Sequence, residues 1–180
     1  MREDINQEAL WVLRAQCGDR EALELLLRHV QPSLRRYLAG FVGPSDADDV
    51  LQESLLLIYR KLKSLETPEL FRPWAFRIAS RAGLRHVKKR RHWSEHIQEQ
   101  DSLDDIPANN ASFDEEGLKE LLATNQISPG CSAVLTLHFE QQMSLAEVAE
   151  VLEIPLGTVK SRLAYGLAAL RKRLSDRRSS

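Results

Sequence analysis

Apolar residues recur at helical spacing along most of the chain, and the strict alternation that predicts strands is rare. Gly18 and Asp19 interrupt the first apolar pattern, and Pro32 is expected to open the next helix. Ser45 or Asp46 is expected to cap a long helix that follows. The spacing therefore predicts helices in the first half over residues 5–28, 32–41, 47–62 and 71–92.

The polar segment 94–113 divides the chain, because it holds several acidic and amide side chains and no sustained apolar period. Such a composition is typical of a flexible linker. It predicts a first domain over residues 1–93 and a second over residues 114–180. Hydrophobic content of 43% is enough for a core, whereas aromatics make up only 6%. We therefore predict an all-α protein with two small helical domains.

The second domain ends in a pattern typical of a helix-turn-helix. A short apolar helix over 145–152 is preceded by Ser144 with Glu147 three residues on, which is a capping-box pattern. Pro155 interrupts the helical pattern, and a second helix follows from Leu156. In such a motif the second helix enters a major groove of DNA, where hydroxyl and cationic side chains bind phosphates and base edges. The polar positions expected to make these contacts are Thr158, Lys160, Ser161, Arg162 and Tyr165.

Charge is distributed unevenly, although the net charge is only −1. Residues 60–92 hold eleven Lys and Arg against two acidic residues. Residues 95–120 hold nine acidic residues and one lysine, and residues 160–178 hold seven basic residues and one acid. Two basic blocks flank an acidic one, which favours two nucleic-acid surfaces joined by an acidic segment. The alternative is that these charges are only solvated helix faces.

The first basic block combines aromatic and cationic side chains. Trp74 and Ile78, four residues apart, are expected in the core, whereas the arginines around them suit single-stranded DNA, where charge pairs with phosphates and bases stack on rings. The residues predicted to contact this DNA are Arg72, Arg77, Arg81, Arg85, Lys88 and Lys89.

Acidic residues cluster at the start of the predicted helix 47–62. A carboxylate there is favourable with the helix dipole, which accounts for Asp46. The dipole explains Asp49 and Glu53 less well, because they lie four residues apart and repel each other on one face. An interface with a protein partner is the better interpretation. The residues assigned to it are Asp48, Asp49, Gln52 and Glu53.

Three segments of the chain carry a resemblance to a known family. LAEVAEVLEIPLGTVKSRLAYGLAALRKRL resembles region four of bacterial sigma factors of the extracytoplasmic-function (ECF) group of the sigma-70 family. DADDVLQESLLLIYRKL and FRPWAFRIASRAGLRHVKKRRH resemble region two of the same family. The resemblance covers about residues 8–93 and 114–175. It implies a transcription initiation factor that directs core RNA polymerase to promoters.

The resemblance also implies a division of labour. The acidic face from Asp48 to Glu53 would bind the clamp helices of the polymerase beta-prime subunit, and the second domain would bind the beta flap. The first basic block would melt and hold the downstream promoter element, with flipped bases held near the loop 64–70. The recognition helix would bind the upstream element as duplex. Tyr165, where relatives often have arginine, and Arg81, where they commonly have asparagine, depart from the family pattern.

Other functions fit the sequence less well. No nucleophile, base or metal spacing accompanies the carboxylates, so we expect no catalytic residues, metal or cofactor. Histidines 86, 92 and 96 form no compact ligand set, and Cys17 and Cys131 are expected to be ordinary thiols. The sequence shows no membrane-spanning run or signal peptide, which predicts a cytoplasmic protein. The resemblance implies that it is bacterial, and an anti-sigma factor is a candidate to hold it at the membrane. An anti-sigma factor is an expected partner; a sigma-like decoy without DNA, a stand-alone helix-turn-helix regulator and, least of all, an enzyme stay open as alternatives.

Overall fold

The computed structural model describes residues 2–94 and 128–178, and every regular element in these two ranges is helical. The predicted linker from residue 95 onwards and the acidic block over residues 95–120 lie outside the described residues, as does the helix that the apolar residues Leu118, Leu121 and Leu122 predict at the start of the second domain. The predicted all-helical fold class is confirmed for the described ranges. The helices of the first domain are α1 (Arg2–Gln16), α2 (Arg20–Val42), α3 (Ala47–Lys61), η1 (Leu62–Ser64), η2 (Pro68–Leu70) and α4 (Phe71–Ser94).

The break between α1 and α2 lies where the sequence predicts it. Gly18 adopts a φ of 95°, which glycine tolerates without a steric penalty. Asp19 is the N-cap of α2, and its carboxylate accepts a hydrogen bond from the backbone N–H of Ala22 at 3.0 Å. The two helices then pack against each other.

One expected boundary is wrong: α2 continues through Pro32 as a single helix. A proline inside a helix removes the hydrogen bond to the carbonyl four residues earlier, here that of Arg28. Both residues are exposed, so water can bind this carbonyl. Val30 and Leu34, which flank the proline, are fully buried and hold the helix against the core. Tertiary packing therefore outweighs the local break.

The start of α3 also differs from the expected cap. Asp46 occupies the N-cap position but makes no side-chain hydrogen bond to the helix backbone. Its carboxylate instead contacts His86 at 3.0 Å and accepts a hydrogen bond from Arg90 at 2.8 Å, both on α4. Asp46 therefore ties α3 to α4. The His86 contact is the main reason that the pKa of Asp46 lies below its ordinary value.

The core of the first domain is built around α2 and α4. The ring of Tyr37 packs edge-on against Phe76 with centroids 5.4 Å apart. Its hydroxyl and that of Ser80 lie 2.7 Å apart, and Ser80 donates to the carbonyl of Phe76. All three side chains are buried, and burial raises the pKa of Tyr37. The polar groups are satisfied, which lets α2 and α4 pack closely.

The second domain contains the predicted helix-turn-helix. Ser144 and Glu147 form the predicted capping box at the start of the first motif helix. Glu153 ends that helix with a φ of 56°, in the left-handed region that reverses the chain. The predicted break and both motif helices are confirmed. The elements are α6 (Pro129–Leu135), the π-helical turn η3 (Thr136–Glu140), α7 (Leu145–Leu152) and α8 (Leu156–Arg178).

Gly166 permits the close packing of α8 on α6. A Cβ atom at this position would lie 2.7 Å from Cδ1 of Leu135, which is closer than carbon atoms can approach. From its helix propensity alone this glycine costs about 1 kcal/mol relative to alanine. Close packing offsets this cost, because the absence of a side chain lets α8 lie directly on buried α6 residues such as Leu135 and Cys131.

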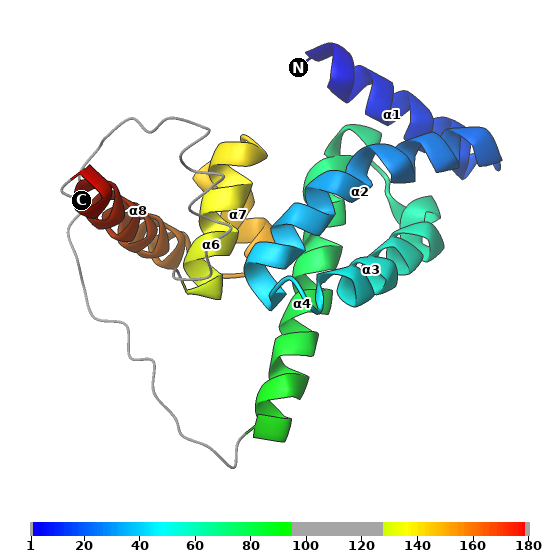
Figure 1. Ribbon diagram of the computed structural model, residues 1–180. Coiled ribbons are helices and arrows are strands. Elements are labelled where there is room, and N and C mark those ends of the chain that lie inside the picture. Colours follow the sequence, from blue (N-terminus) through cyan, green and yellow to red (C-terminus); the bar gives the residue numbers. More distant parts are fainter. Residues whose placement is uncertain (1, 95–127, 179–180) are drawn as a thin grey trace.

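The two domains pack against each other in the described residues. Figure 1 shows α6 beside α2 and α7 beside α4, and one buried apolar cluster runs through both domains. The fit is close at Gly40 of α2, where a Cβ would lie 2.8 Å from the hydroxyl oxygen of Ser132. The functional surfaces of the two domains must therefore be considered together.

Candidate polymerase and nucleic-acid interfaces

The first half of α4 directs two of its predicted DNA-contacting arginines at α7. Arg77 donates from Nε to the backbone carbonyl of Glu150 at 3.1 Å. Arg81, one turn further on, binds the carboxylate of Glu153 through both Nε and a terminal nitrogen. The hydrogen bond from Arg81 lowers the pKa of Glu153, and the same pair raises the pKa of Arg81. Sequence reasoning missed both partners, the carbonyl of Glu150 and the carboxylate of Glu153, because they lie about seventy residues away.

Arg72 lies deeper than the other predicted DNA contacts. Its guanidinium donates to the buried carboxylate of Glu8 on α1, at 2.5 Å, and to the side-chain oxygen of Gln141 at 3.1 Å. His29 lies 3.1 Å from the same carboxylate. Arg72 thus joins α1, α2 and the second domain, and a structural role accounts for its position.

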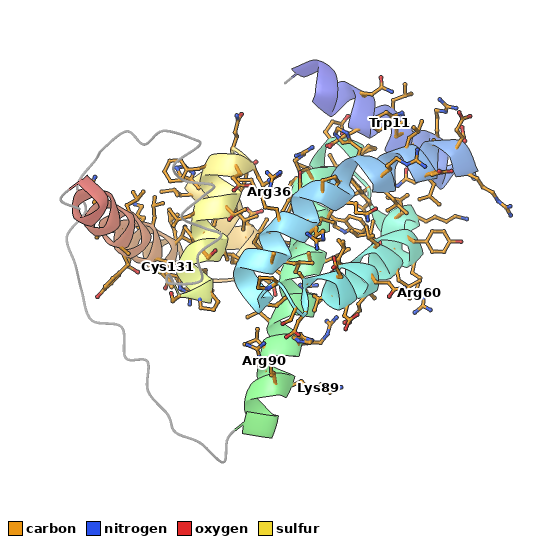
Figure 2. All side chains as sticks on the ribbon, viewed as in Figure 1. Trp11, Arg36, Arg60, Lys89, Arg90 and Cys131 are labelled. Carbon is orange, nitrogen blue, oxygen red and sulfur yellow. The ribbon has the colours of Figure 1, made fainter. Side chains whose placement is uncertain are left out.

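The second half of α4 protrudes below the body of the molecule (Figure 1). Figure 2 shows Lys89 and Arg90 on this protruding part. Lys88 and Lys89 are exposed. Arg85 donates to Glu53 of α3 at 2.8 Å, and both side chains are more than half exposed, so the pair is screened by solvent. These cations are accessible to a nucleic acid and, unlike Arg77 and Arg81, do not contact α7.

A pocket of about 290 Å³ lies between the domains, at the loop expected to hold flipped bases. The first domain supplies residues 64–67, Leu70, Pro73, Trp74 and Arg77. The second domain supplies Glu147, Glu150 and Val151 of α7. An aromatic ring beside a cation suits the stacking of an unpaired base. In the closed arrangement of the two domains, α7 forms one wall of this pocket.

The predicted polymerase-binding residues lie along one exposed side of α3. Asp48 accepts two hydrogen bonds from Arg35, at 2.7 and 3.1 Å, and hydrogen bonding to Arg35 is the main cause of its lowered pKa. Glu53 accepts the bond from Arg85 described above. Asp49 and Gln52 are exposed.

The same side of α3 continues with apolar residues that the sequence analysis missed. Leu56 is 46% exposed and Tyr59 is 56% exposed, which is unusual for side chains of this size. Leu56 follows Gln52 by four residues, and Tyr59 follows Leu56 by three, so the helical period puts them on one face. This spacing was the signal that could have identified them. Together with Asp49 and Gln52 they form a surface that is polar at one end and apolar at the other.

Four of the predicted recognition residues on α8, Thr158, Ser161, Arg162 and Tyr165, lie within an arc of about 100°, whereas Lys160 lies apart from them. Val159 is fully buried, and at about 100° per residue Arg162 lies about 60° to one side of it and Lys160 about 100° to the other. The guanidinium of Arg162 lies against Gly130 at the start of α6, about 3.1 Å from where a Cβ would be. Lys160 is exposed, and the hydroxyl of Ser161 donates to the carbonyl of Thr158.

The described residues hold no group of three or more acidic, histidine or cysteine side chains that could bind a metal ion. His86 contacts Asp46, as described above, and His96 lies outside the described residues. Cys17 is exposed and Cys131 is buried, and neither forms a disulfide in the described part of the chain. None of the helices in the described ranges is long and apolar enough to cross a membrane.

Comparison with known proteins agrees with this arrangement. The family descriptions "Sigma-70 region 2" and "Sigma-70, region 4" match residues 26–92 and 125–172, and together they span more than half of the chain. The ECF RNA polymerase sigma-E factor of Haemophilus influenzae is 28% identical over 175 residues, which cover 91% of this chain and 92% of the relative. The chain belongs to the ECF group of the sigma-70 family. The RNA polymerase sigma-H factor of Pseudomonas aeruginosa is also similar, with 29% identity over 188 residues and coverage of 93% and 94%.

A similar fold is also found among solved structures. The sigma factor RpoE of Bartonella quintana, solved in complex with the anti-sigma factor NepR, has a TM-score of 0.65 and 24% identity, covering 84% of this chain and 96% of that one. At this identity the likeness shows a shared fold. Region 2 of this ECF sigma factor comprises α2 to α4 and region 4 comprises α6 to α8, in the order that the sequence analysis expected.

Proposed function

We propose that this ECF sigma factor directs core RNA polymerase to promoters by dividing three binding tasks between its domains. Residues 1–93 bind the polymerase and hold the melted downstream element, residues 94–113 link the domains, and residues 114–180 bind the upstream element as duplex. The protein acts in the bacterial cytoplasm beside the polymerase, which performs the chemistry. The family membership of both regions carries this proposal.

The polymerase contact is assigned to the exposed side of α3. Asp49 and Gln52 are open to a partner there, and the apolar Leu56 and Tyr59 add the kind of surface that gives a protein interface its affinity. Asp48 and Glu53 carry ion pairs to arginines of the same domain, which are exposed and exchange readily with a partner's cations. The beta-prime clamp helices and the beta flap are the proposed partners of the first and second domains.

The DNA contacts are assigned to two helices. On α4 these are Arg77, Arg81, Arg85, Lys88 and Lys89, with the pocket at the loop 64–70 for an unpaired base. On α8 they are Thr158, Lys160, Ser161, Arg162 and Tyr165. Arg72, which the sequence also predicted as a DNA contact, is assigned instead to its contacts with Glu8 and Gln141. An anti-sigma factor is a further proposed partner, supported by the structural neighbour solved with one.

Charge reversal on α3 tests the polymerase contact. Changing Asp49 and Glu53 to lysine should weaken binding to core polymerase about tenfold or more, because like charges would then face each other across the interface. The measurement is co-purification with core enzyme together with run-off transcription from a promoter selected by the wild-type protein.

The matched control is Glu24→Lys on α2. Glu24 pairs with Arg28 at 2.5 Å in an exposed ion pair much like that of Glu53 with Arg85, so the control breaks a similar pair elsewhere. Undiminished co-purification of the α3 double variant would contradict the assignment. A wild-type protein that gives no promoter-dependent transcript would instead favour a decoy that lacks DNA binding. A protein that binds promoter DNA and represses transcription without binding core polymerase would instead favour a stand-alone helix-turn-helix regulator.

A further inference from the structure

Helix α1 lies outside region 2, which comprises α2 to α4, yet it contacts the loop expected to hold flipped bases. The short helices η1 and η2, one at each end of this loop, both contact α1. The loop has few anchors of its own, because among residues 63–70 only Leu65 is buried. Its conformation therefore depends on the elements packed against it, and α1 is one of them.

Gln16, the last residue of α1, binds two backbone carbonyls at the start of this loop. Its side-chain nitrogen donates to the carbonyl oxygen of Leu62 at 2.9 Å and to that of Leu65 at 2.8 Å. Both partners are acceptors, so only the amide NH₂ group, with its two hydrogens, can serve them. Carbonyls at the end of a helix need partners from outside it, and Gln16 supplies one here. The contact fixes the backbone at the residues that line the pocket, 64–67.

A second contact from α1 fixes the other end of the loop. The carboxylate of Glu8 is only 6% exposed and accepts the bonds from Arg72, the second residue of α4. A carboxylate so far removed from water requires a paired cation, which gives this contact a defined geometry. Eight residues separate Glu8 from Gln16, which is about 12 Å along the helix axis. One helix therefore holds both ends of the loop.

We propose that α1 sets the base preference at the downstream element by holding the loop 64–70 in the shape that receives an unpaired base. Gln16 and Glu8 are positioning residues, which act on the DNA through the loop and through Arg72. A pocket discriminates between bases only when its walls are held in place, because a mobile loop adapts to each base in turn. This inference rests on the proposed function of the loop.

The test removes the amide donor and keeps the shape of the side chain. Gln16→Met is nearly isosteric and cannot donate a hydrogen bond to the two carbonyls. The full-length chain is assembled with core polymerase, and run-off transcription is measured on promoters that carry each base at each downstream-element position. We expect the ratio of rates between the best and the worst base at the most selective position to fall about tenfold. Base preference in the upstream element, which is assigned to α8, should not change.

Two further variants of α1 serve as controls. Gln7→Met makes the same replacement at an exposed position of the helix and should leave the ratio unchanged. Gln16→Lys returns a donor to carbonyls at a helix end, where a cation is favoured, and should recover most of the discrimination. A loss of folded protein lowers transcription from every promoter alike. The ratio is therefore independent of the active fraction and reports the shape of the loop.

The contact between Glu8 and Arg72 is tested by a double-mutant cycle. Glu8→Gln and Arg72→Met should each lower the ratio about threefold, and the double variant should lower it no further, because the two side chains act as one unit. Neither should change the salt dependence with which the assembled polymerase binds a single-stranded downstream-element oligomer. A salt slope that falls by about 0.7 for Arg72→Met would place this guanidinium on a phosphate and overturn its positioning role.

The outcomes separate this inference from the proposed function. If the wild-type protein shows no base preference at the downstream element, the proposed function of the loop fails and the inference fails with it. If the wild type discriminates and Gln16→Met does so equally well, α1 does not set the preference, and the proposed function stands. Equal losses of preference at the upstream and downstream elements, or an equal loss in Gln7→Met, would also overturn the inference. If Gln16→Met does not fold, Glu8→Gln and Arg72→Met carry the same test.

Discussion

The two helices predicted to contact DNA, α4 and α8, carry similar cations but differ in what covers them. The arginines of the first half of α4 bind the end of α7, whereas Lys160 on α8 is exposed. Both helices show the same sequence signal, a basic face beside an apolar one. The difference teaches that a cationic pattern predicts which residues can bind a phosphate, while neighbouring elements decide which of them are available in the free chain.

The largest effect is expected where α8 packs on α6. Gly166→Leu would force a side chain into the space of Leu135 and should destabilise the second domain by about 1–3 kcal/mol, despite its better helix propensity. Duplex binding by α8 should fall as that domain unfolds. Thermal unfolding and duplex binding measure this. Gly157→Leu is the control, because nothing lies within 4 Å of its Cβ position; equal losses for both would show that the close approach is unimportant.

The next effect separates the two cations on α8. Arg162→Ala should cost about 1–3 kcal/mol in duplex binding and relax preference at one base pair if its side chain leaves Gly130 to contact a base. Lys160→Ala should weaken binding to all sequences and reduce the salt slope by about 0.9 if it contacts a phosphate. Affinity across a panel of duplexes and salt concentrations measures both. Equal, sequence-independent losses would show that neither contacts a base edge.

Within α4, a salt series should separate the arginines that contact α7 from the lysines of the protruding half. In the free chain, replacing Lys88 and Lys89 by alanine should reduce the salt slope for single-stranded DNA by about 1.4, because each contact with a single strand contributes about 0.7. Replacing Arg77 and Arg81 should change this slope little, because α7 already binds both. Slopes that fall equally would contradict the difference in availability.

The smallest expected effect is that of pH on the radius of gyration of the free chain. Arg81 holds the pKa of Glu153 below its ordinary value of 4.5, so the carboxylate favours the closed state above that pH. Its contribution should be lost as the pH falls through the lowered pKa. The radius of gyration should therefore stay constant down to about pH 4.5 and grow below it, before the chain unfolds. The variant Glu153→Asn should lack this low-pH expansion; an identical profile would show that other carboxylates hold the domains together.

Local signals predicted much of the fold correctly. The break at Gly18 and Asp19, the capping box at Ser144 and the turn before Pro155 were predicted because each depends on a few adjacent residues. The boundary at Pro32 was wrong because buried neighbours hold α2 together across a local break. The cap expected from Asp46 was replaced by contacts to His86 and Arg90, forty or more residues away.

The sequence alone determined the all-helical fold, the helix-turn-helix and the identity of the cationic and acidic helix faces, since these follow from spacing along the chain. It also indicated the family, through the resemblance of three segments to sigma regions two and four. Only the tertiary structure decided that Arg77 and Arg81 meet Glu150 and Glu153, and that α7 closes the pocket beside Trp74. The physical reason is that ion pairs and cavities between domains depend on how two separate surfaces fit together, and no periodicity within either segment records that fit.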